Sequence, residues 1–432
     1  MNWRRWIYTA LLYLLLPYVL FHLLARARRQ PEYLLHWGER FGHYSTRSLR
    51  PVIWLHTVSV GETRAAAPLV QALRARYPNH QILLTHMTPT GRDTGEQLFG
   101  AGVLRCYLPY DYPFAVRRFL DHFKPQLGLL LETEIWPNLI QACHNKQVPL
   151  CLLNARLSEK SARRYARFGK LARASLKQLD TVAAQTEADG CRFSELGARD
   201  PRVMGNLKFD ITPPPSAIEL GKTLRERFGA GRPVFLAAST REGEEESILD
   251  ALAASDGPGL ENLLTVIVPR HPQRFDAVAQ LIARRAPRFQ RRSAGGPVAP
   301  ETTVVLGDSM GEMFAYYAAC DVALIGGSLL PFGGQNLIEA CALGKPVVLG
   351  PHTYNFAEAA ALAVEAGAAL RVEDAVEMAR EVRSLLLDAP RREAMGQAGL
   401  AFSHHHQGAT ARALALLEPY LPTGSAAISA TD

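Results

Sequence analysis

VIWLHTVSVGETRAAAPLVQALRARY, residues 52–77, contains the unit that decides the fold of this 432-residue chain. A continuous apolar run over 52–60 is followed by a helical pattern over 62–77. A short apolar run without alternation predicts a strand buried on both faces, as in a parallel sheet whose strands are joined by helices. The stretch therefore predicts one strand–helix unit of a parallel α/β sheet.

The same unit recurs in two groups. Further apolar runs lie at 82–88, 103–109, 127–132, 149–155 and 181–186, and then at 234–240, 263–270, 303–308, 321–328 and 346–351. Helical patterns separate them, which predicts an α/β fold with two doubly wound, Rossmann-like domains. Such sheets bind ligands at the carboxyl ends of their strands, so we expect the two domains to face each other across a cleft.

Three consecutive prolines lie between the two groups, in ITPPPSA (211–217). Prolines in a row favour a stiff extended segment. The predicted organisation is a membrane anchor over 1–30, an N-terminal α/β domain over 31–212, a proline-rich linker over 213–217, a C-terminal α/β domain over 218–403, and a C-terminal helix and tail over 404–432.

Composition excludes several classes of protein. With 48% hydrophobic and 21% charged residues, the chain is neither mainly disordered nor a small disulfide scaffold. Its six cysteines show no CxxC pair, so we expect free thiols in a reducing compartment.

The net charge is +7, of which +6 lies in residues 1–50 (eight Arg, two Glu). A nucleic-acid binder would spread its basic residues over a folded face, so we expect no nucleic-acid partner.

The N-terminal excess of arginine flanks the most apolar segment of the chain. IYTALLYLLLPYVLFHLLA, residues 7–25, has no formally charged side chain and is close to the length of a membrane-spanning helix. A helix lying on the membrane and bent at Pro17 is the alternative. Either way, anionic lipids would attract the flanking arginines. We expect a membrane-anchored protein whose catalytic domains are cytoplasmic.

Polar residues of the first domain follow predicted strands. Glu62 opens the helix after the first strand, where it is either a general base kept ionised by the helix N-terminus or a capping glutamate. Glu132 and Glu134 follow a second strand and could bind sugar hydroxyls or form salt bridges. Lys208 precedes the linker, either as an anion-binding residue or as a solvated side chain.

In the second domain, Arg270 and His271 end a strand just before a helix, an arrangement suited to phosphate. The turn Gly326-Gly327-Ser328 ends another strand and precedes a helix predicted to begin near Gln335. Backbone N–H groups could approach a phosphate there, and Glu339 could accept hydrogen bonds from ribose. A glycine-rich connection packed closely on the sheet is the alternative.

Several cofactor and metal motifs are missing. The sequence has no GxGxxG after its first predicted strand, no P-loop, no GxSxG elbow and no HExxH. We therefore expect no cofactor and no bound catalytic metal.

The chain resembles a known enzyme family over nearly its whole length. HTVSVGE (56–62), ETEIWPN (132–138), NARLSEKSARRY (154–165), GNLKFD (205–210), VPRHPQRF (268–275) and GGSLLPFGGQNLIEA (326–340) occur in the order typical of bacterial 3-deoxy-D-manno-octulosonic acid (Kdo) transferases. The resemblance implies the two-domain GT-B glycosyltransferase fold. It also implies inverting transfer of Kdo from CMP-Kdo to the lipid A precursor, at the cytoplasmic face of the inner membrane. The resemblance further implies that the first α/β domain binds the acceptor and the second binds the CMP-sugar.

The resemblance also implies roles for individual residues. The family's catalytic base falls on Glu62, and Glu132 and Lys208 match positions that line the cleft. The positions that bind CMP are Arg270, His271, Gly326, Gly327, Ser328, Asn336 and Glu339. The family often has His where this chain has Gln335, so a role of a histidine side chain does not carry over to this position, whereas the backbone cradle does.

Two other functions remain open at the level of sequence. A GT-B enzyme could use a UDP-sugar on a lipid acceptor, which an assay of both donors would detect. A membrane-tethered nucleotide-binding protein without turnover would not need Glu62. The oligomeric state and the number of Kdo residues added are not indicated.

Overall fold

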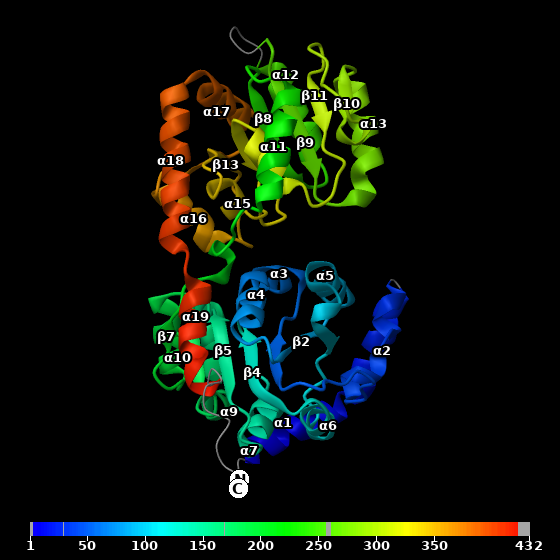
Figure 1. The fold of residues 1–432 in the computed structure, drawn as a ribbon, viewed down its shortest axis with the longest axis vertical. Helices are drawn as coiled ribbons and strands as arrows, with labels where there is room; N and C mark the ends of the chain where they lie inside the picture. Colours follow the sequence, from blue (N-terminus) through cyan, green and yellow to red (C-terminus); the bar gives the residue numbers. More distant parts are fainter. Residues whose placement is uncertain (1–2, 29, 168, 256–260, 422–432) are drawn as a thin grey trace. The chain divides into compact units, whose positions relative to one another are not determined.

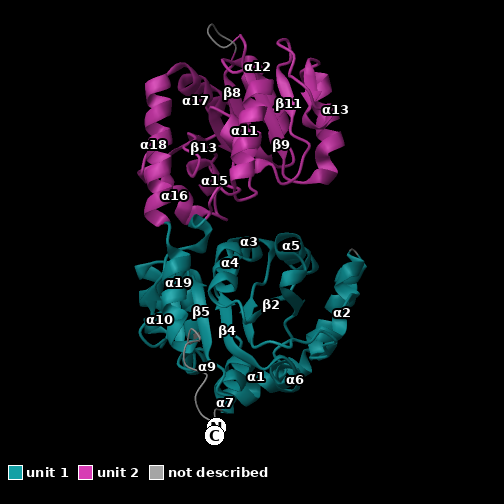
Figure 2. Ribbon diagram, in the orientation of Figure 1, with its two compact units in different colours: residues 1–210, 407–432 teal, residues 211–406 magenta. Residues whose placement is uncertain are grey.

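The computed structural model describes residues 3–28, 30–167, 169–255 and 261–421 and divides into two compact units. Unit 1 comprises residues 1–210 and 407–432, and unit 2 comprises residues 211–406 (Figure 2). Each unit contains its own seven-stranded sheet, in which every strand pair is parallel. The predicted class, two α/β domains with doubly wound sheets, is confirmed.

The sheet of unit 1 has the strand order β3-β2-β1-β4-β5-β6-β7 (Figure 1). Its strands are β1 (Val52–His56), β2 (Gln81–His86), β3 (Leu104–Tyr107), β4 (Pro125–Leu131), β5 (Leu150–Ala155), β6 (Thr181–Ala184) and β7 (Arg202–Val203). All five residues of β1 are buried, as its continuous apolar run predicts. The strand order reverses between β1 and β4, which is where such sheets bind ligands.

Helices cover both faces of this sheet. They are α1 (Trp3–Leu14), α2 (Leu16–Ala27), α3 (Val60–Ala65), α4 (Ala67–Arg76), α5 (Pro89–Phe99), α6 (Pro113–Phe123), α7 (Pro137–Asn145), α8 (Glu159–Arg167), α9 (Gly169–Leu176), α10 (Glu187–Glu195) and α19 (Ala409–Leu417). Ile53 and Leu55 of β1 share a core with α4, α5 and α19, whereas Trp54 shares a core with α6, α7 and α9 on the opposite face. The C-terminal helix is thus part of the core of unit 1.

The sheet of unit 2 has the order β10-β11-β9-β8-β12-β13-β14. Its strands are β8 (Val234–Thr240), β9 (Leu264–Pro269), β10 (Phe289–Arg291), β11 (Val304–Leu306), β12 (Val322–Ile325), β13 (Val347–Leu349) and β14 (Ala369–Arg371). Its helices are α11 (Pro215–Phe228), α12 (Glu244–Ala254), α13 (Phe275–Arg285), α14 (Met313–Ala319), α15 (Ile338–Cys341), α16 (Ala357–Glu365), α17 (Ala375–Leu387) and α18 (Ala389–His406). Here the order reverses between β8 and β12.

The predicted linker ends sooner than its sequence suggests. Pro215 is the first residue of α11, so residues 215–217 are helical and do not belong to an extended linker. Proline is tolerated at a helix start because the N–H group that it lacks would have no partner there. At the other boundary α18 continues to His406, past the predicted domain end at 403. Residues 422–432 of the predicted tail lie outside the described residues.

The apolar N-terminal segment forms two helices where the sequence predicts one. Helices α1 and α2 meet at Leu15 with a bend of 48°. Pro17 lies in the first turn of α2 and lacks the N–H group that would continue the hydrogen bonds of α1. Among the described residues no single helix is long and apolar enough to cross a membrane, and only this bent pair has the required length and composition. Residues 1, 2 and 29 of the predicted anchor lie outside the described part.

Candidate active site

Glu62 caps the helix to which it belongs. Ser59 is the N-cap of α3, and its hydroxyl accepts a hydrogen bond from the Glu62 N–H. The Glu62 carboxylate reaches back to accept the Val58 N–H at 2.7 Å on Oε2 and the Ser59 hydroxyl at 3.2 Å on Oε1. This reciprocal arrangement is a variant of the capping box, because the carboxylate accepts the N–H of Val58, the residue before the N-cap, and not that of Ser59. Each carboxylate oxygen has a second lone pair, so capping does not exclude a role as a base.

The charge state of Glu62 differs from the sequence-based expectation. We expected the helix N-terminus to keep this carboxyl ionised, but burial, together with the charges of Glu132 and Glu134, raises its pKa to about 8 against the hydrogen bonds from Val58 and Ser59 that lower it. Desolvation outweighs the helix because α3 is only six residues long and the side chain is largely covered. A carboxyl with a pKa near the working pH is suited to proton transfer.

Glu132 and Lys208 lie beside Glu62 in unit 1. Glu132 directly follows β4 and has a left-handed backbone, with φ of 60°, a conformation that clusters at functional sites. Its Oε1 lies 3.7 Å from the Lys208 Nζ, so the two form an ion pair. Glu134 accepts a hydrogen bond from the Trp136 indole at 2.5 Å, and burial raises its pKa. Unit 1 thus gathers three carboxyls and a lysine at the β1/β4 switch point.

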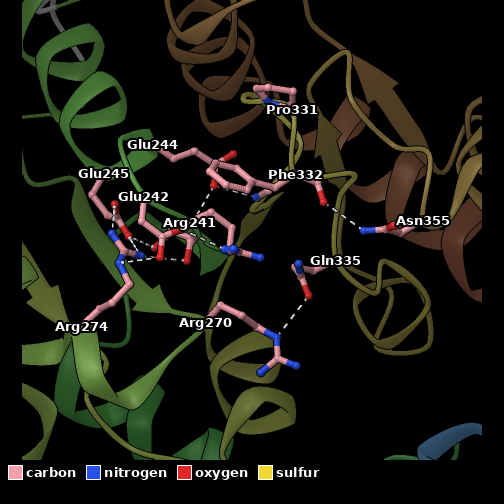
Figure 3. A network of polar contacts seen from close by, with 12 residues as sticks. Arg241, Glu242, Glu244, Glu245, Arg270, Arg274, Pro331, Phe332, Gln335 and Asn355 are labelled. Atoms are coloured by element: carbon pink, nitrogen blue, oxygen red, sulfur yellow. Dashed lines mark hydrogen bonds and ion pairs between the residues drawn. The ribbon is translucent and has the colours of Figure 1, made fainter. Parts of the chain in front are cut away.

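Unit 2 places cationic side chains after β8 and β9 (Figure 3). Arg270 follows β9, and its Nε donates to Gln335 Oε1 at 3.2 Å. Arg241 follows β8, and its guanidinium lies 4.5 Å from the centre of the Phe332 ring. Burial lowers the pKa of His271, and the charges of Arg241 and Arg270 lower it further. Arg241 also pairs with Glu242, whose Oε2 lies 3.2 Å from its Nε, so the guanidinium groups are held at the carboxyl edge of the sheet, where they could contact an anion.

The turn Gly326-Gly327-Ser328 differs from the predicted phosphate cradle. Two of its N–H groups are used inside unit 2: Gly326 donates to Ala238 O, and Gly327 donates to Glu244 Oε2 at 2.6 Å. A Cβ on Gly326 would lie 2.5 Å from the Ser239 backbone, so glycine is needed there for close packing on β8. The fully buried Ser328 hydroxyl donates to the Ile325 carbonyl. The N–H groups of Gly326 and Gly327 are therefore taken up by contacts within unit 2, and the binding of CMP at this turn stays a prediction.

The helix after the glycines begins later than predicted. Helix α15 has four residues and starts at Ile338, not near Gln335. Asn336 fixes this start, because its Oδ1 accepts the Ile338 N–H at 3.0 Å. The Asn336 Nδ2 donates to Glu339 Oε1 at 3.1 Å. Asn336 and Glu339 therefore lie together, and Gln335 connects this segment to Arg270.

Sequence reasoning missed Arg241 and Glu244. Glu244 is fully buried and accepts the N–H groups of Arg241, Gly327 and Leu329 at 2.8, 2.6 and 3.0 Å. Glu245 is also buried and forms a bidentate ion pair with Arg274 (Figure 3). The strand-end rule that found Arg270 would also have found Arg241, the first residue after β8. The loop after β11, with Gly311 at φ of 80°, is a further strand end that was not considered.

No group of three or more His, Cys, Asp or Glu side chains suited to a metal ion occurs in the part of the chain that the structure describes. The sequence-based expectation of no catalytic metal remains a prediction.

Comparison with known proteins identifies relatives of this chain. The family model described as 3-deoxy-D-manno-octulosonic-acid transferase (kdotransferase) matches residues 35–211, and the model for group 1 glycosyl transferases matches residues 288–401. A 3-deoxy-D-manno-octulosonic acid transferase of Bordetella pertussis is 45% identical over 429 residues, covering 96% of this chain and 99% of the relative. That of Haemophilus influenzae is 38% identical over 422 residues, with the same coverage.

Solved structures share the fold at low sequence identity. A UDP-GlcNAc 2-epimerase from Neisseria meningitidis matches with a TM-score of 0.57 and 16% identity, covering 85% of this chain and all of that one. A glycosyltransferase from Rickettsia africae matches with a TM-score of 0.56 and 13% identity, covering 87% of this chain and all of that one. The predicted GT-B architecture is confirmed.

Proposed function

Since the chain belongs to the 3-deoxy-D-manno-octulosonic acid (Kdo) transferase family, we propose that it transfers Kdo from CMP-Kdo to the lipid A precursor, an acylated glucosamine disaccharide. Membership of the family makes it a glycosyltransferase of lipopolysaccharide biosynthesis. The proposal for donor and acceptor rests on two groups of polar side chains, one in each unit. Unit 1 holds a carboxyl whose pKa is near 8, and unit 2 holds a group of cations, each at the carboxyl edge of its sheet.

Glu62 is the proposed general base. Its ionised carboxylate accepts the proton of the acceptor hydroxyl as the oxygen of that hydroxyl attacks the anomeric carbon of Kdo. The bond from that carbon to the CMP phosphate breaks on the opposite side, so one displacement inverts the configuration. CMP leaves with the electron pair of the broken bond, and no covalent enzyme intermediate forms.

Arg270, His271 and Arg241 are the proposed partners of the CMP phosphate. A preorganised guanidinium stabilises the charge that develops on a leaving phosphate. Gln335 holds Arg270 by the 3.2 Å hydrogen bond, so the cation does not have to be ordered when the nucleotide binds. Backbone N–H groups after β9, where α13 follows, add a favourable dipole. Asn336 and Glu339 are proposed to contact the ribose.

Lys208 and Glu132 are proposed to line the site and to stabilise the transition state. The Lys208 ammonium can pair with the carboxylate of Kdo, while Glu132 keeps that ammonium at the carboxyl edge of the sheet. The mechanism assigns the leaving group to cations of the protein itself and uses no metal or cofactor.

The cytoplasmic face of the inner membrane is the proposed location. All six cysteines are free, and five of them are buried, which supports a reducing compartment. The N-terminal segment would hold the protein at anionic lipids, where the acylated acceptor resides.

The pKa of Glu62 gives a testable pH dependence. Because this pKa is raised to about 8 and the base must be ionised, we expect the transfer rate to rise with pH up to about 8 and then to level off. The free energy of unfolding changes in the opposite direction. Because the folded protein binds the Glu62 proton more tightly than the unfolded chain does, the free energy of unfolding decreases as the pH rises from about 5 to 8. Rates measured from pH 5.5 to 9 check this. A rate that is constant across that range would contradict the assignment.

Nucleotide binding is tested by calorimetry with CMP. We expect Arg270→Ala to weaken CMP binding by about tenfold to a hundredfold, because a charge-assisted hydrogen bond to phosphate is lost. Glu339→Ala should also weaken it, through the ribose. Arg285→Ala is the matched control, since Arg285 pairs with Asp250 and Glu246 on helices of the same unit. Unchanged affinity in the first two variants would place the nucleotide elsewhere, and tighter binding of UDP than of CMP would favour a UDP-sugar donor.

A further inference from the structure

Helices α1 and α2 present one continuous stripe of side chains to unit 1. The better covered residues follow a helical period through the bend, at positions 4, 5, 8, 9, 12, 16, 19, 20, 23 and 27. Leu23 and Ala27 are buried at the end of this stripe, and α2 packs there against the 3-10 helix Pro31–Leu34. The stripe makes this pair of helices a packed part of unit 1 and not a free tether.

Hydrogen bonds fasten α1 to unit 1. The Tyr8 hydroxyl donates to Asp111 Oδ2 at 3.0 Å, and the Thr9 hydroxyl donates to Asn138 Oδ1 at 3.1 Å. The buried Asp111 carboxyl also accepts the Asn138 N–H at 2.9 Å at the start of α7. Four residues after Tyr8, the Leu12 carbonyl accepts the Tyr112 hydroxyl at 3.0 Å. A segment that left unit 1 to cross a bilayer would lose these bonds.

The opposite side of the two helices is apolar and bare. Thirteen of the 21 exposed large hydrophobic side chains in the described residues lie between residues 3 and 37. On α1 and α2 this outer face consists of Trp3, Trp6, Ile7, Leu11, Leu14, Tyr18, Phe21 and Leu24, whereas Tyr13 at its edge packs against the rings of Tyr112 and Phe114 in unit 1. Leu14 is 75% exposed and Phe21 69%. An apolar patch of this extent on one element marks an interaction surface.

The charged residues beside the outer face indicate which kind of surface it binds. Arg26 and Arg28 are exposed beside it, Arg4 is half-buried at its N-terminal end, and the first acidic residue of the chain is Glu32. Tryptophan and tyrosine are the aromatic residues preferred at the level of lipid headgroups. Each helix has 12 residues, about 18 Å in length, whereas a bilayer core is about 30 Å thick.

We propose that α1 and α2 lie in the plane of an anionic membrane surface, held between unit 1 and the lipid, and do not span the bilayer. The inner stripe packs on unit 1, the outer face enters the boundary between headgroups and acyl chains, and the arginines pair with lipid phosphates. The pair then acts as a rigid mount that holds unit 1 at a fixed distance from the lipid surface.

Nitroxide labels at single cysteines test the orientation. Cys191 is the one exposed cysteine in the described residues, so Cys191→Ser gives a background in which the other five are buried. Labels at residues 3, 14, 18 and 21 of the full chain, in phosphatidylglycerol-containing vesicles, should all lie about 5–10 Å below the headgroups, and one at residue 23 should contact protein. A label at residue 14 near the bilayer centre, with residues 3 and 25 at opposite surfaces, would overturn the proposal. Labels that remain in water would also overturn it.

The distance between two labels tests whether α1 stays packed on unit 1 at the membrane. A label at residue 14 and one at residue 145, at the end of α7, should give a single narrow distance distribution in vesicles, because α1 packs on α7. A broad distribution would show that the segment leaves unit 1. These measurements require no turnover, so their outcome is independent of the proposed Kdo transfer.

Vesicle binding tests the outer face. The double variant Leu14→Ser with Phe21→Ser should lower partitioning into anionic vesicles by at least about tenfold, because two apolar side chains leave the lipid boundary. Leu387→Ser, which alters a half-exposed leucine of unit 2, should have no effect. Binding that is equal for anionic and purely phosphatidylcholine vesicles, or unchanged in the double variant, would contradict the proposal.

Discussion

Replacing Glu62 with glutamine should lower the rate of Kdo transfer by about a hundredfold or more, because a positioned general base typically contributes that much. Glutamine has the size of glutamate, and its side-chain carbonyl oxygen can still accept the Val58 N–H. The variant should therefore keep its fold and its affinity for CMP. Initial rates with donor and acceptor in excess, together with thermal unfolding, measure both quantities.

Ser59→Ala is the matched control for this experiment. It removes the N-cap hydroxyl of α3 but leaves the carboxyl, so it should cost about 1 kcal/mol of unfolding free energy and only a modest part of the rate. If Ser59→Ala were as inactive as Glu62→Gln, the loss would arise from the helix start and not from proton transfer. Activity of Glu62→Gln within a few-fold of wild type would remove Glu62 from the mechanism.

Truncating Glu244 to alanine should destabilise unit 2 by about 3 kcal/mol or more. The change leaves the buried N–H groups of Arg241, Gly327 and Leu329 without their acceptor, and each unsatisfied group costs about 1–3 kcal/mol. The glycine turn and Arg241 would also lose their common anchor, so CMP affinity should fall at least about tenfold. Denaturant unfolding and calorimetry measure the two effects.

Glu242→Ala is the control two residues away. The Glu242 side chain is half exposed and pairs with Arg241 and Arg274 near the surface. Such pairs contribute at most about 1 kcal/mol. Equal losses of stability in the two variants would show that Glu244 has no special role in holding the glycine turn.

The sequence predicts the central strands because the signal for each one, a continuous apolar run, lies within the strand itself. β1, β4, β5, β8 and β9 are largely buried apolar runs, and each of their ends was expected within two residues except the C-terminal end of β1, which was placed four residues too late. β7, β10 and β14 were missed: they have two or three residues each and lie at or next to the sheet edges. Strands of two or three residues are too short to show a pattern of apolar and polar residues.

The sequence predicts which strand ends carry the candidate site, but it does not predict the pKa values or the buried contacts of the residues there. The rule that ligands bind at strand ends locates Glu62, Glu132 and Arg270. The pKa of Glu62 depends on burial and on Glu132, which is 70 residues away in sequence, so no local pattern reveals it. Glu244 stands in a run of three glutamates that is typical of an exposed helix start, yet the structure buries it as the acceptor for a turn more than 80 residues later. Long-range contacts of this kind are not visible in the sequence.

The most direct test of the central claim is product analysis by mass spectrometry. The purified full chain is incubated with CMP-Kdo and the lipid A precursor, and in parallel with UDP-sugars, with Glu62→Gln as the inactive control. We expect a lipid product larger than the precursor by one or more Kdo residues, formed from CMP-Kdo alone and only by the wild-type protein. A folded wild-type protein that forms no Kdo-bearing lipid, or that instead transfers sugar from a UDP donor, would contradict the account.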